Sequence, residues 1–89
     1  MYTIVFSEEA IEGVRALKKS NLPSFKKLSK LIEELKIHPF EGTGHPEPLV
    51  HMSGLWSRRI DKKNRLLYTV KDEEILVIVV SVLGHYNDK

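Results

Sequence analysis

The sequence predicts an α+β domain in which an N-terminal strand and a two-helix hairpin are followed by antiparallel strands forming a twisted sheet. Apolar residues recur at helical spacing between positions 10 and 35, whereas β-branched and aromatic residues dominate three short runs after position 54. Because helices and strands are segregated along the chain, the helices are expected to pack on one face of the sheet. A chain of 89 residues has room for one core, so residues 1–89 are predicted to form a single domain.

The N-terminal elements carry start signals. Residues 2–6 are β-branched and aromatic and are predicted to form a strand. Ser7 is a good N-cap for the first helix, and Glu8 and Glu9 follow in the first turn, where the helix dipole favours negative charge. Pro23 suits the start of the second helix. The apolar face of that helix consists of Phe25, Leu28, Leu31, Ile32 and Leu35.

The second half of the chain is predicted to be a loop followed by three strands. Residues 38–48 contain three prolines and two glycines, which favours an irregular loop. Strands are expected at residues 55–61, 65–71 and 75–83, with polar turns between them. In the first of these strands, alternation places Arg58 on one face of the sheet and Arg59 on the other. Charged residues inside strands indicate that one face stays open to solvent or a ligand.

Composition excludes several classes of protein. The chain has no cysteine, so disulfides, thiolate nucleophiles and zinc–thiolate sites are excluded. Its longest apolar run, residues 75–80, is far shorter than the roughly 20 residues needed to cross a bilayer. The N-terminus lacks the basic and apolar regions of a secretory signal. A soluble cytoplasmic protein with no membrane partner is expected.

Charge is unevenly distributed although the net charge is only +2. Residues 15–30 contain six cations and no acid, and residues 51–71 contain six cations against one acid, Asp61. These blocks are typical either of a surface that binds phosphates or of solvated, lysine-rich faces, and the sequence leaves both interpretations open.

A few residues could carry chemistry. Glu47 stands between Pro46 and Pro48, which stiffen the backbone and could pre-position the carboxylate; an ordinary surface acid is the alternative. Arginine side chains on neighbouring strands suit phosphate recognition and the stabilisation of charge on phosphate oxygens. Histidine as a residue type titrates near neutrality, so His85 could donate or accept a proton, although a histidine near a C-terminus is usually just exposed.

Together these residue types point to RNA cleavage by general acid–base catalysis. A carboxylate would take the proton of the 2′-hydroxyl, which attacks the adjacent phosphorus, and a histidine would protonate the departing 5′-oxygen. No pair of histidines has the i, i+4 spacing of a helical metal site, so neither a catalytic metal nor a cofactor is predicted.

Four motifs carry a family resemblance. The segments 39–49 (PFEGTGHPEPL), 53–60 (SGLWSRRI) and 64–68 (NRLLY), followed by His85-Tyr86, resemble the YoeB/Txe toxins of the RelE/ParE toxin–antitoxin superfamily. The resemblance implies a microbial-RNase-like fold and a ribosome-dependent endoribonuclease, an mRNA interferase that cuts mRNA in the ribosomal A site and stops translation.

The resemblance also implies roles for individual residues. Glu47 is expected to be the general base, Arg65 the transition-state stabiliser and His85 the general acid, while Tyr86 orients the site or stacks on a base. RNA contacts are expected from Arg58, Arg59, His51, Lys62 and Lys63. Many relatives carry lysine at the positions of His45 and Val50, and relatives often end at the His-Tyr pair, which residues 87–89 extend here.

The implied partners are mRNA, the ribosome with its ribosomal RNA at the A site, and a YefM-type antitoxin whose disordered part folds onto the toxin. A homodimer is a further expectation. Two alternatives stay open at this stage: a non-catalytic ParE-like toxin that inhibits DNA gyrase, and an inactive relative that only binds antitoxin.

Overall fold

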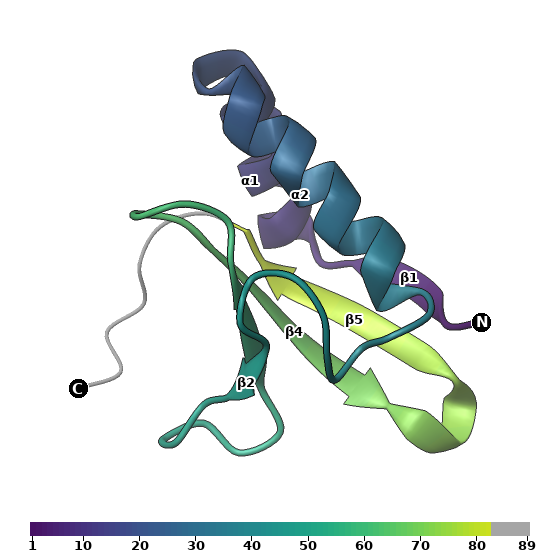
Figure 1. The fold of residues 1–89 in the computed structure, drawn as a ribbon. Helices are drawn as coiled ribbons and strands as arrows, with labels where there is room; N and C mark the ends of the chain where they lie inside the picture. The colour runs from purple at the N-terminus through teal and green to yellow at the C-terminus, as the bar shows by residue number, and fades with distance from the viewer. Residues whose placement is uncertain (83–89) are drawn as a thin grey trace.

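Two helices cover one face of a five-stranded sheet (Figure 1). The computed structural model describes residues 1–82. The elements, in chain order, are β1 (Thr3–Phe6), α1 (Glu8–Ser20), α2 (Leu22–Leu35), β2 (Glu47–Pro48), β3 (Trp56–Arg59), β4 (Arg65–Lys71), the 3₁₀ helix η1 (Asp72–Glu74) and β5 (Leu76–Ser81). The predicted α+β class is confirmed.

The sheet is mixed and has the strand order β1-β5-β4-β3-β2. The strands after the helices pair antiparallel with one another, as predicted. β1 instead joins the sheet parallel to β5, with Thr3 opposite Leu76. The helical hairpin carries the chain over the sheet between β1 and the later strands, and so the first strand lies beside the last.

The helix boundaries follow from their caps. The Ser7 side chain accepts a hydrogen bond from the backbone N–H of Ala10, so the predicted N-cap is confirmed. Asn21 caps α2 in the same way, by accepting from the backbone N–H of Ser24. No helix within residues 1–82 is long and apolar enough to cross a membrane.

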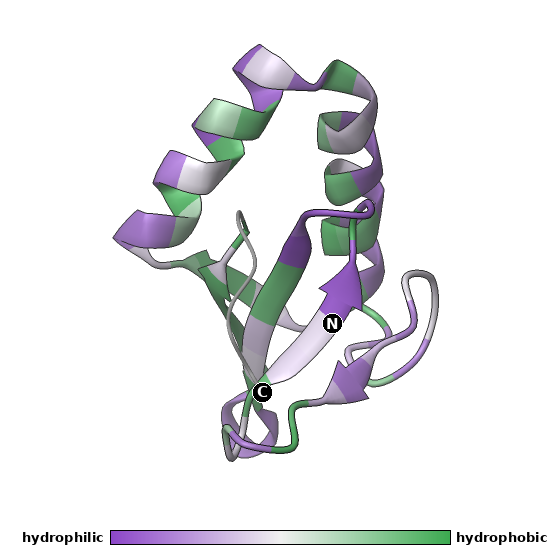
Figure 2. Ribbon diagram, turned by 90° about the vertical axis from the view of Figure 1, so that its left-hand side faces the viewer, coloured by the Kyte–Doolittle hydropathy of each residue, from purple (hydrophilic) through white to green (hydrophobic). Residues whose placement is uncertain are grey.

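The hydrophobic core lies between the helices and the covered face of the sheet. Figure 2 shows hydrophobic residues recurring along both helices and along the strands beneath them. The fully buried cluster comprises Ala10, Leu17, Leu28, Leu31, Leu35, Ile60, Leu66, Tyr68, Val77, Val79 and Val82. Because one face of the sheet is filled in this way, functional side chains are left to the other face.

The segment between α2 and β3 is more ordered than the sequence predicted. The predicted irregular loop, residues 38–48, ends in β2, where Glu47 pairs with Ser57 of β3 and Pro48 with Trp56. Further along, Leu49 is buried and its backbone N–H donates to the carbonyl of Leu55 at 2.9 Å. The Glu47 backbone is therefore part of the sheet.

Candidate functional site

Strand register brings four polar side chains to the open face of the sheet. Glu47 of β2 is opposite Ser57 of β3, and Arg59 of β3 is opposite Arg65 of β4. Residues paired across antiparallel strands share a face, as do residues two apart on one strand. Glu47, Ser57, Arg59 and Arg65 therefore project from the side of the sheet that the helices do not cover.

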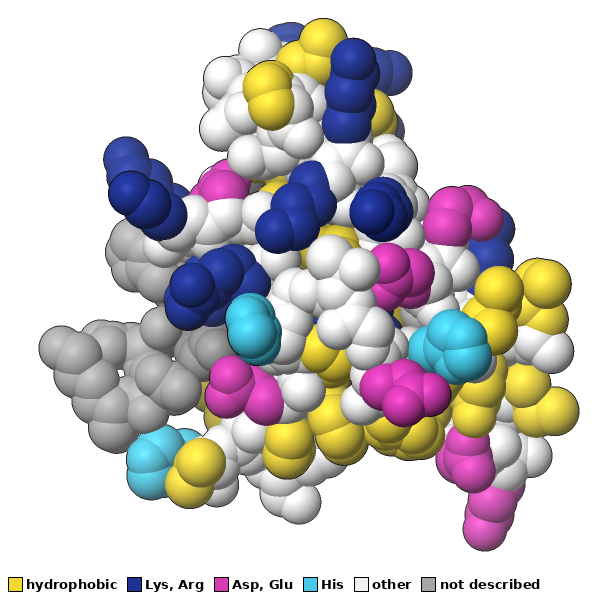
Figure 3. Space-filling model, in the orientation of Figure 1, with side chains coloured by type: hydrophobic (Ala, Val, Ile, Leu, Met, Phe, Trp, Pro, Cys, Tyr) yellow, Lys and Arg dark blue, Asp and Glu magenta, His cyan; other side chains and the backbone are white. Residues whose placement is uncertain are grey.

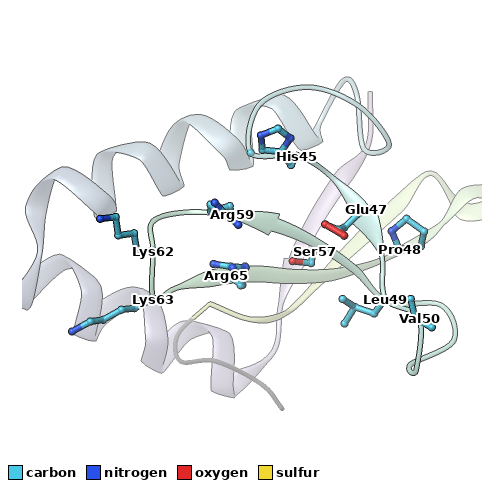
Figure 4. Close-up of a pocket in the computed structure, with 11 residues that line it drawn as sticks. His45, Glu47, Pro48, Leu49, Val50, Ser57, Arg59, Lys62, Lys63 and Arg65 are labelled. Atoms are coloured by element: carbon cyan, nitrogen blue, oxygen red, sulfur yellow. The ribbon is translucent and has the colours of Figure 1, made fainter. Parts of the chain in front are cut away.

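These side chains line a cavity of about 400 Å³ (Figure 4). Among residues 1–82, the only carboxylate that lines it is that of Glu47, which lies among the cationic side chains of Arg59, Lys62, Lys63 and Arg65. In the described part of the chain, the lining residues are Gly44, His45, Glu47, Pro48, Leu49, Val50, Ser57, Arg59, Lys62, Lys63 and Arg65. A hollow with this excess of positive charge is suited to a polyanion with a reactive group near the carboxylate.

The cavity contains two arginines, Arg59 and Arg65. Nη1 of Arg65 donates to the backbone carbonyl of Asp61 at 3.1 Å and to that of Asn64 at 3.4 Å, which fixes the guanidinium near the β3–β4 turn. Within residues 1–82, no carboxylate forms an ion pair with Arg59 or Arg65. Like charges directly opposite each other destabilise a sheet, and a bound anion would remove this repulsion.

The Asp61 carboxylate holds the β3–β4 turn and does not neutralise these arginines. It accepts hydrogen bonds from Ser24 Oγ at 2.6 Å and from the backbone N–H groups of Lys63 at 2.8 Å and Asn64 at 2.7 Å. Burial alone would raise the pKa of Asp61, but the hydrogen bonds from Ser24, Asn64 and Lys63 outweigh it and hold the pKa well below its usual value. The turn that carries Lys62 and Lys63 is thus fastened to α2.

Arg58 is a correction to the predicted RNA contacts. Its side chain is completely buried on the helix side of the sheet and forms an ion pair with Glu34, Nη1 to Oε1, at 2.9 Å. Its Nε donates to the Tyr68 hydroxyl at 3.3 Å, and its Nη2 donates to the backbone carbonyls of His38 and Glu41. A guanidinium without exposed surface cannot reach RNA, so the prediction that Arg58 contacts RNA is wrong.

Thr43 completes this buried network. Its Oγ1 donates to Glu34 Oε2 at 2.6 Å and its backbone N–H to Glu34 Oε1 at 2.8 Å. These bonds, chiefly that of the Thr43 hydroxyl, together with Arg58, lower the pKa of Glu34 in spite of partial burial and so keep the carboxylate ionised. We refer to Glu34, Thr43, Arg58 and Tyr68 as the Arg58 clamp.

The structure brings together some of the other predicted residues. Lys62 and Lys63 line the cavity with Arg59 and Arg65. His51 is exposed in the turn that follows β2 and does not line the cavity. His85 and Tyr86 lie outside the described residues. The roles assigned to all of these residues stay predictions.

His45 was not among the predicted site residues, but its side chain lines the cavity two positions before Glu47 (Figure 4). Its backbone has a positive φ of 52°, an uncommon conformation for a residue other than glycine. The position next to the Pro-Glu-Pro motif was the available signal. Among residues 1–82, no group of three or more histidine and acidic side chains is arranged to hold a metal ion.

Comparison with known proteins assigns the family. The family model described as "YoeB-like toxin of bacterial type II toxin-antitoxin system" matches residues 6–86. The chain belongs to this family. The resemblance drawn from the four motifs is thereby confirmed, and the YoeB-like family places the chain in the RelE/ParE superfamily.

Curated YoeB toxins cover most of the chain. The toxin YoeB of Escherichia coli K12 is 40% identical over 75 residues, which span 83% of this chain and 89% of the relative. The toxin YoeB of a Synechocystis species is 37% identical over 84 residues, which span 93% of this chain and 95% of the relative.

Solved YoeB structures share the fold. A YoeB/ParE toxin from Agrobacterium tumefaciens superimposes with a TM-score of 0.87 at 31% identity and covers 97% of this chain and 100% of its own. A chain of a YoeB–YefM complex from Staphylococcus aureus gives a TM-score of 0.80 at 33% identity and covers 97% of this chain and 99% of its own. A YoeB dimer from the same species gives a TM-score of 0.82 at 32% identity and covers 96% of this chain and 98% of its own.

Proposed function

We propose that this YoeB-like toxin is a ribosome-dependent endoribonuclease that cleaves mRNA in the ribosomal A site and so stops translation. The observation that carries the proposal is the face shared by Glu47, Arg59 and Arg65. Within residues 1–82, Glu47 is the only carboxylate that lines the cavity, and no acidic side chain forms an ion pair with the cations around it. RNA supplies both the phosphate for the cations and the 2′-hydroxyl for the carboxylate.

In the proposed mechanism Glu47 is the general base. It takes the proton of the 2′-hydroxyl, and the 2′-oxygen forms a bond to the adjacent phosphorus. Arg65, supported by Arg59, stabilises the charge that grows on the phosphate oxygens. The bond from phosphorus to the 5′-oxygen then breaks, and His85 gives that oxygen a proton. Tyr86 orients the reacting groups, and Lys62 and Lys63 bind neighbouring phosphates.

β5 ends close to Arg65 along the sheet. Ser81 is paired with Leu67 of β4, two positions from Arg65. The assignment of His85 as general acid follows the sequence motif, and His85 lies outside the described residues.

We further propose that the chain binds a YefM-type antitoxin and forms a homodimer. Similar chains of known structure come from a YoeB–YefM complex and from a YoeB dimer. Co-purification with the product of a neighbouring reading frame tests the first proposal. Light scattering of the purified toxin tests the second, since a monomer at micromolar concentration would contradict it.

A translation reaction with a defined message tests the proposed activity. The wild type should cut the message at A-site codons, and Glu47→Gln should lower the rate about 10²–10⁴-fold, the usual contribution of a general base. Glu12→Gln is the matched control, because it removes the same charge from an exposed position on α1. Equal cleavage by wild type and Glu47→Gln would refute the role of Glu47. Inhibition of gyrase supercoiling without mRNA cleavage would favour the ParE-like alternative.

A further inference from the structure

We propose that Arg58 is a positioning residue: through the Arg58 clamp it fixes the loop before β2 so that Glu47 faces Arg59 and Arg65. The inference rests on the proposed function, because it concerns the rate of the same cleavage reaction. It gives a functional reason for a fully buried charge that the mechanism itself does not use.

The clamp holds the loop at successive carbonyl groups. The Tyr68 hydroxyl donates to the carbonyl of Pro39 at 2.7 Å, and Arg58 donates to that of Glu41 at 2.8 Å and that of Thr43 at 3.4 Å. The next carbonyl, that of Gly44, accepts from the backbone N–H of Arg59 at 2.7 Å. The loop is therefore tied to β3 and β4 up to three positions before Glu47.

Glu47 depends on this support because its own strand is very short. β2 has two residues, and Glu47 is exposed, so little packing holds the carboxylate in place. On the C-terminal side, burial of Leu49 anchors the chain. On the N-terminal side, the Arg58 clamp and the Gly44–Arg59 hydrogen bond make the corresponding anchor.

β3 links this anchor to the site. Arg58 points to the helix side of the sheet and holds the loop, whereas its neighbour Arg59 points to the cavity. Phe40 of the loop adds an apolar contact, with its ring centroid 5.0 Å from that of Trp56 on β3. A displaced loop would therefore change where Glu47 lies relative to Arg59.

The geometry requires arginine at position 58. One planar guanidinium donates to a carboxylate, a hydroxyl and three backbone carbonyls. Lysine has the same charge but three donors on a single atom, so it cannot serve both the loop carbonyls and Tyr68. Arg58→Lys therefore keeps the positive charge and removes the planar group with its several donors, which separates the two roles.

Single-turnover cleavage on ribosomes carrying a defined message tests the inference. Arg58→Lys should lower the rate at saturating toxin about 10²-fold, the size of effect that a displacement of about 1 Å can have. Thr43→Val removes the hydroxyl bond to Glu34 and should lower the rate about 3–10-fold, as expected for the loss of one hydrogen bond. Ribosome affinity should stay unchanged in both variants, since neither alters a cavity-lining residue.

A control separates positioning from simple loss of stability. Leu17→Ala destabilises the core from α1, away from the loop, and should cleave at the wild-type rate at a temperature where it is folded. Folded Arg58→Lys and Thr43→Val variants that cleave within twofold of the wild type would overturn the inference. The inference would also be overturned if these variants bound the ribosome more weakly but cleaved at the wild-type rate at saturating toxin. That result would favour a direct contact with the ribosome or its mRNA.

A second measurement does not depend on activity. The amide of Arg59, which donates to Gly44, should exchange with solvent faster in Thr43→Val and Arg58→Lys than in the wild type. If the exchange rate of that amide is unchanged in both folded variants, the inference is overturned, whether or not the wild type cleaves mRNA. Absence of cleavage by the wild type would instead refute the proposed function. If Arg58→Lys does not fold, Thr43→Val decides.

Discussion

Arg59 of β3 and Arg65 of β4 lie directly opposite each other in the sheet, on the face that carries Glu47. Two cations at paired positions are unfavourable in the free protein and become favourable when an anion lies between them. The space-filling view shows that lysine and arginine side chains also gather over the helices and toward the β3–β4 turn (Figure 3).

The first prediction concerns this pair. Arg59→Gln should stabilise the free protein at low salt by about 0.2–1 kcal/mol, because it removes the cross-strand repulsion. Inorganic phosphate should raise the Tm of the wild type and raise that of the variant less. Thermal unfolding with and without phosphate checks both effects. Arg15→Gln on α1 is the control, and equal stabilisation of all three proteins by phosphate would contradict the prediction.

The second prediction concerns salt. If Lys63 contacts a phosphate of single-stranded RNA, Lys63→Gln should reduce the slope of log affinity against log salt by about 0.7. Lys71→Gln removes a cation from the far end of β4, outside the cavity, and should leave the slope unchanged. Ribosome-binding titrations over a range of salt concentrations measure the slope, and the same value for both variants would argue against the contact.

The third prediction concerns pH. The pKa of Asp61 is lower in the folded protein than in the unfolded chain, so its ionised form stabilises the fold above about pH 4, the ordinary carboxyl range. This contribution is lost as the pH falls through the folded-state pKa. Asp61→Asn should therefore lower the free energy of unfolding by about 1 kcal/mol at pH 7, through weaker hydrogen bonds, and by progressively less below pH 4. Urea unfolding over this pH range provides the measurement, and a difference that does not depend on pH would refute the assignment.

The fourth prediction uses two glycines with nearly the same positive φ. Gly44 has φ +86° and Gly54 has φ +85°, so at both positions alanine would be held at a φ that residues with a side chain rarely adopt, at a cost of about 1–2 kcal/mol. A Cβ at Gly44 would also lie 2.9 Å from the Arg59 carbonyl oxygen, whereas at Gly54 the nearest atom is 4.0 Å away. Gly44→Ala should therefore be the less stable variant in urea unfolding and should cleave RNA more slowly. Equal stability would show that the close approach at Gly44 is not needed.

Local signals were sufficient to predict the helices and most of the sheet. Ser7 caps α1 because its hydroxyl accepts from a nearby N–H, and the apolar spacing in α2 marks the face that is buried. Pairings between distant segments could not be predicted in this way. Thr3 and Leu76 carry nothing that indicates parallel pairing, and Glu47 was placed in an irregular loop because prolines surround it.

The candidate site was predictable from its motifs, except where burial reversed a residue's role. Alternation predicted that Arg58 and Arg59 lie on opposite faces of the sheet, but it does not tell which face is buried, and arginine is rarely fully buried. Its ion-pair partner, Glu34, is 24 positions earlier in the chain, and its other acceptors are backbone carbonyls, which no side-chain pattern reveals.

The parallel pairing of β1 with β5 has a consequence for synthesis of the chain. Thr3 is synthesised 73 positions before its partner Leu76. Non-local pairings of this kind form late, because loop-closure entropy must be overcome before they contribute. A nascent chain that stops short of β5 lacks the strand that lies between β1 and β4, so the sheet cannot be completed before β5 has been made.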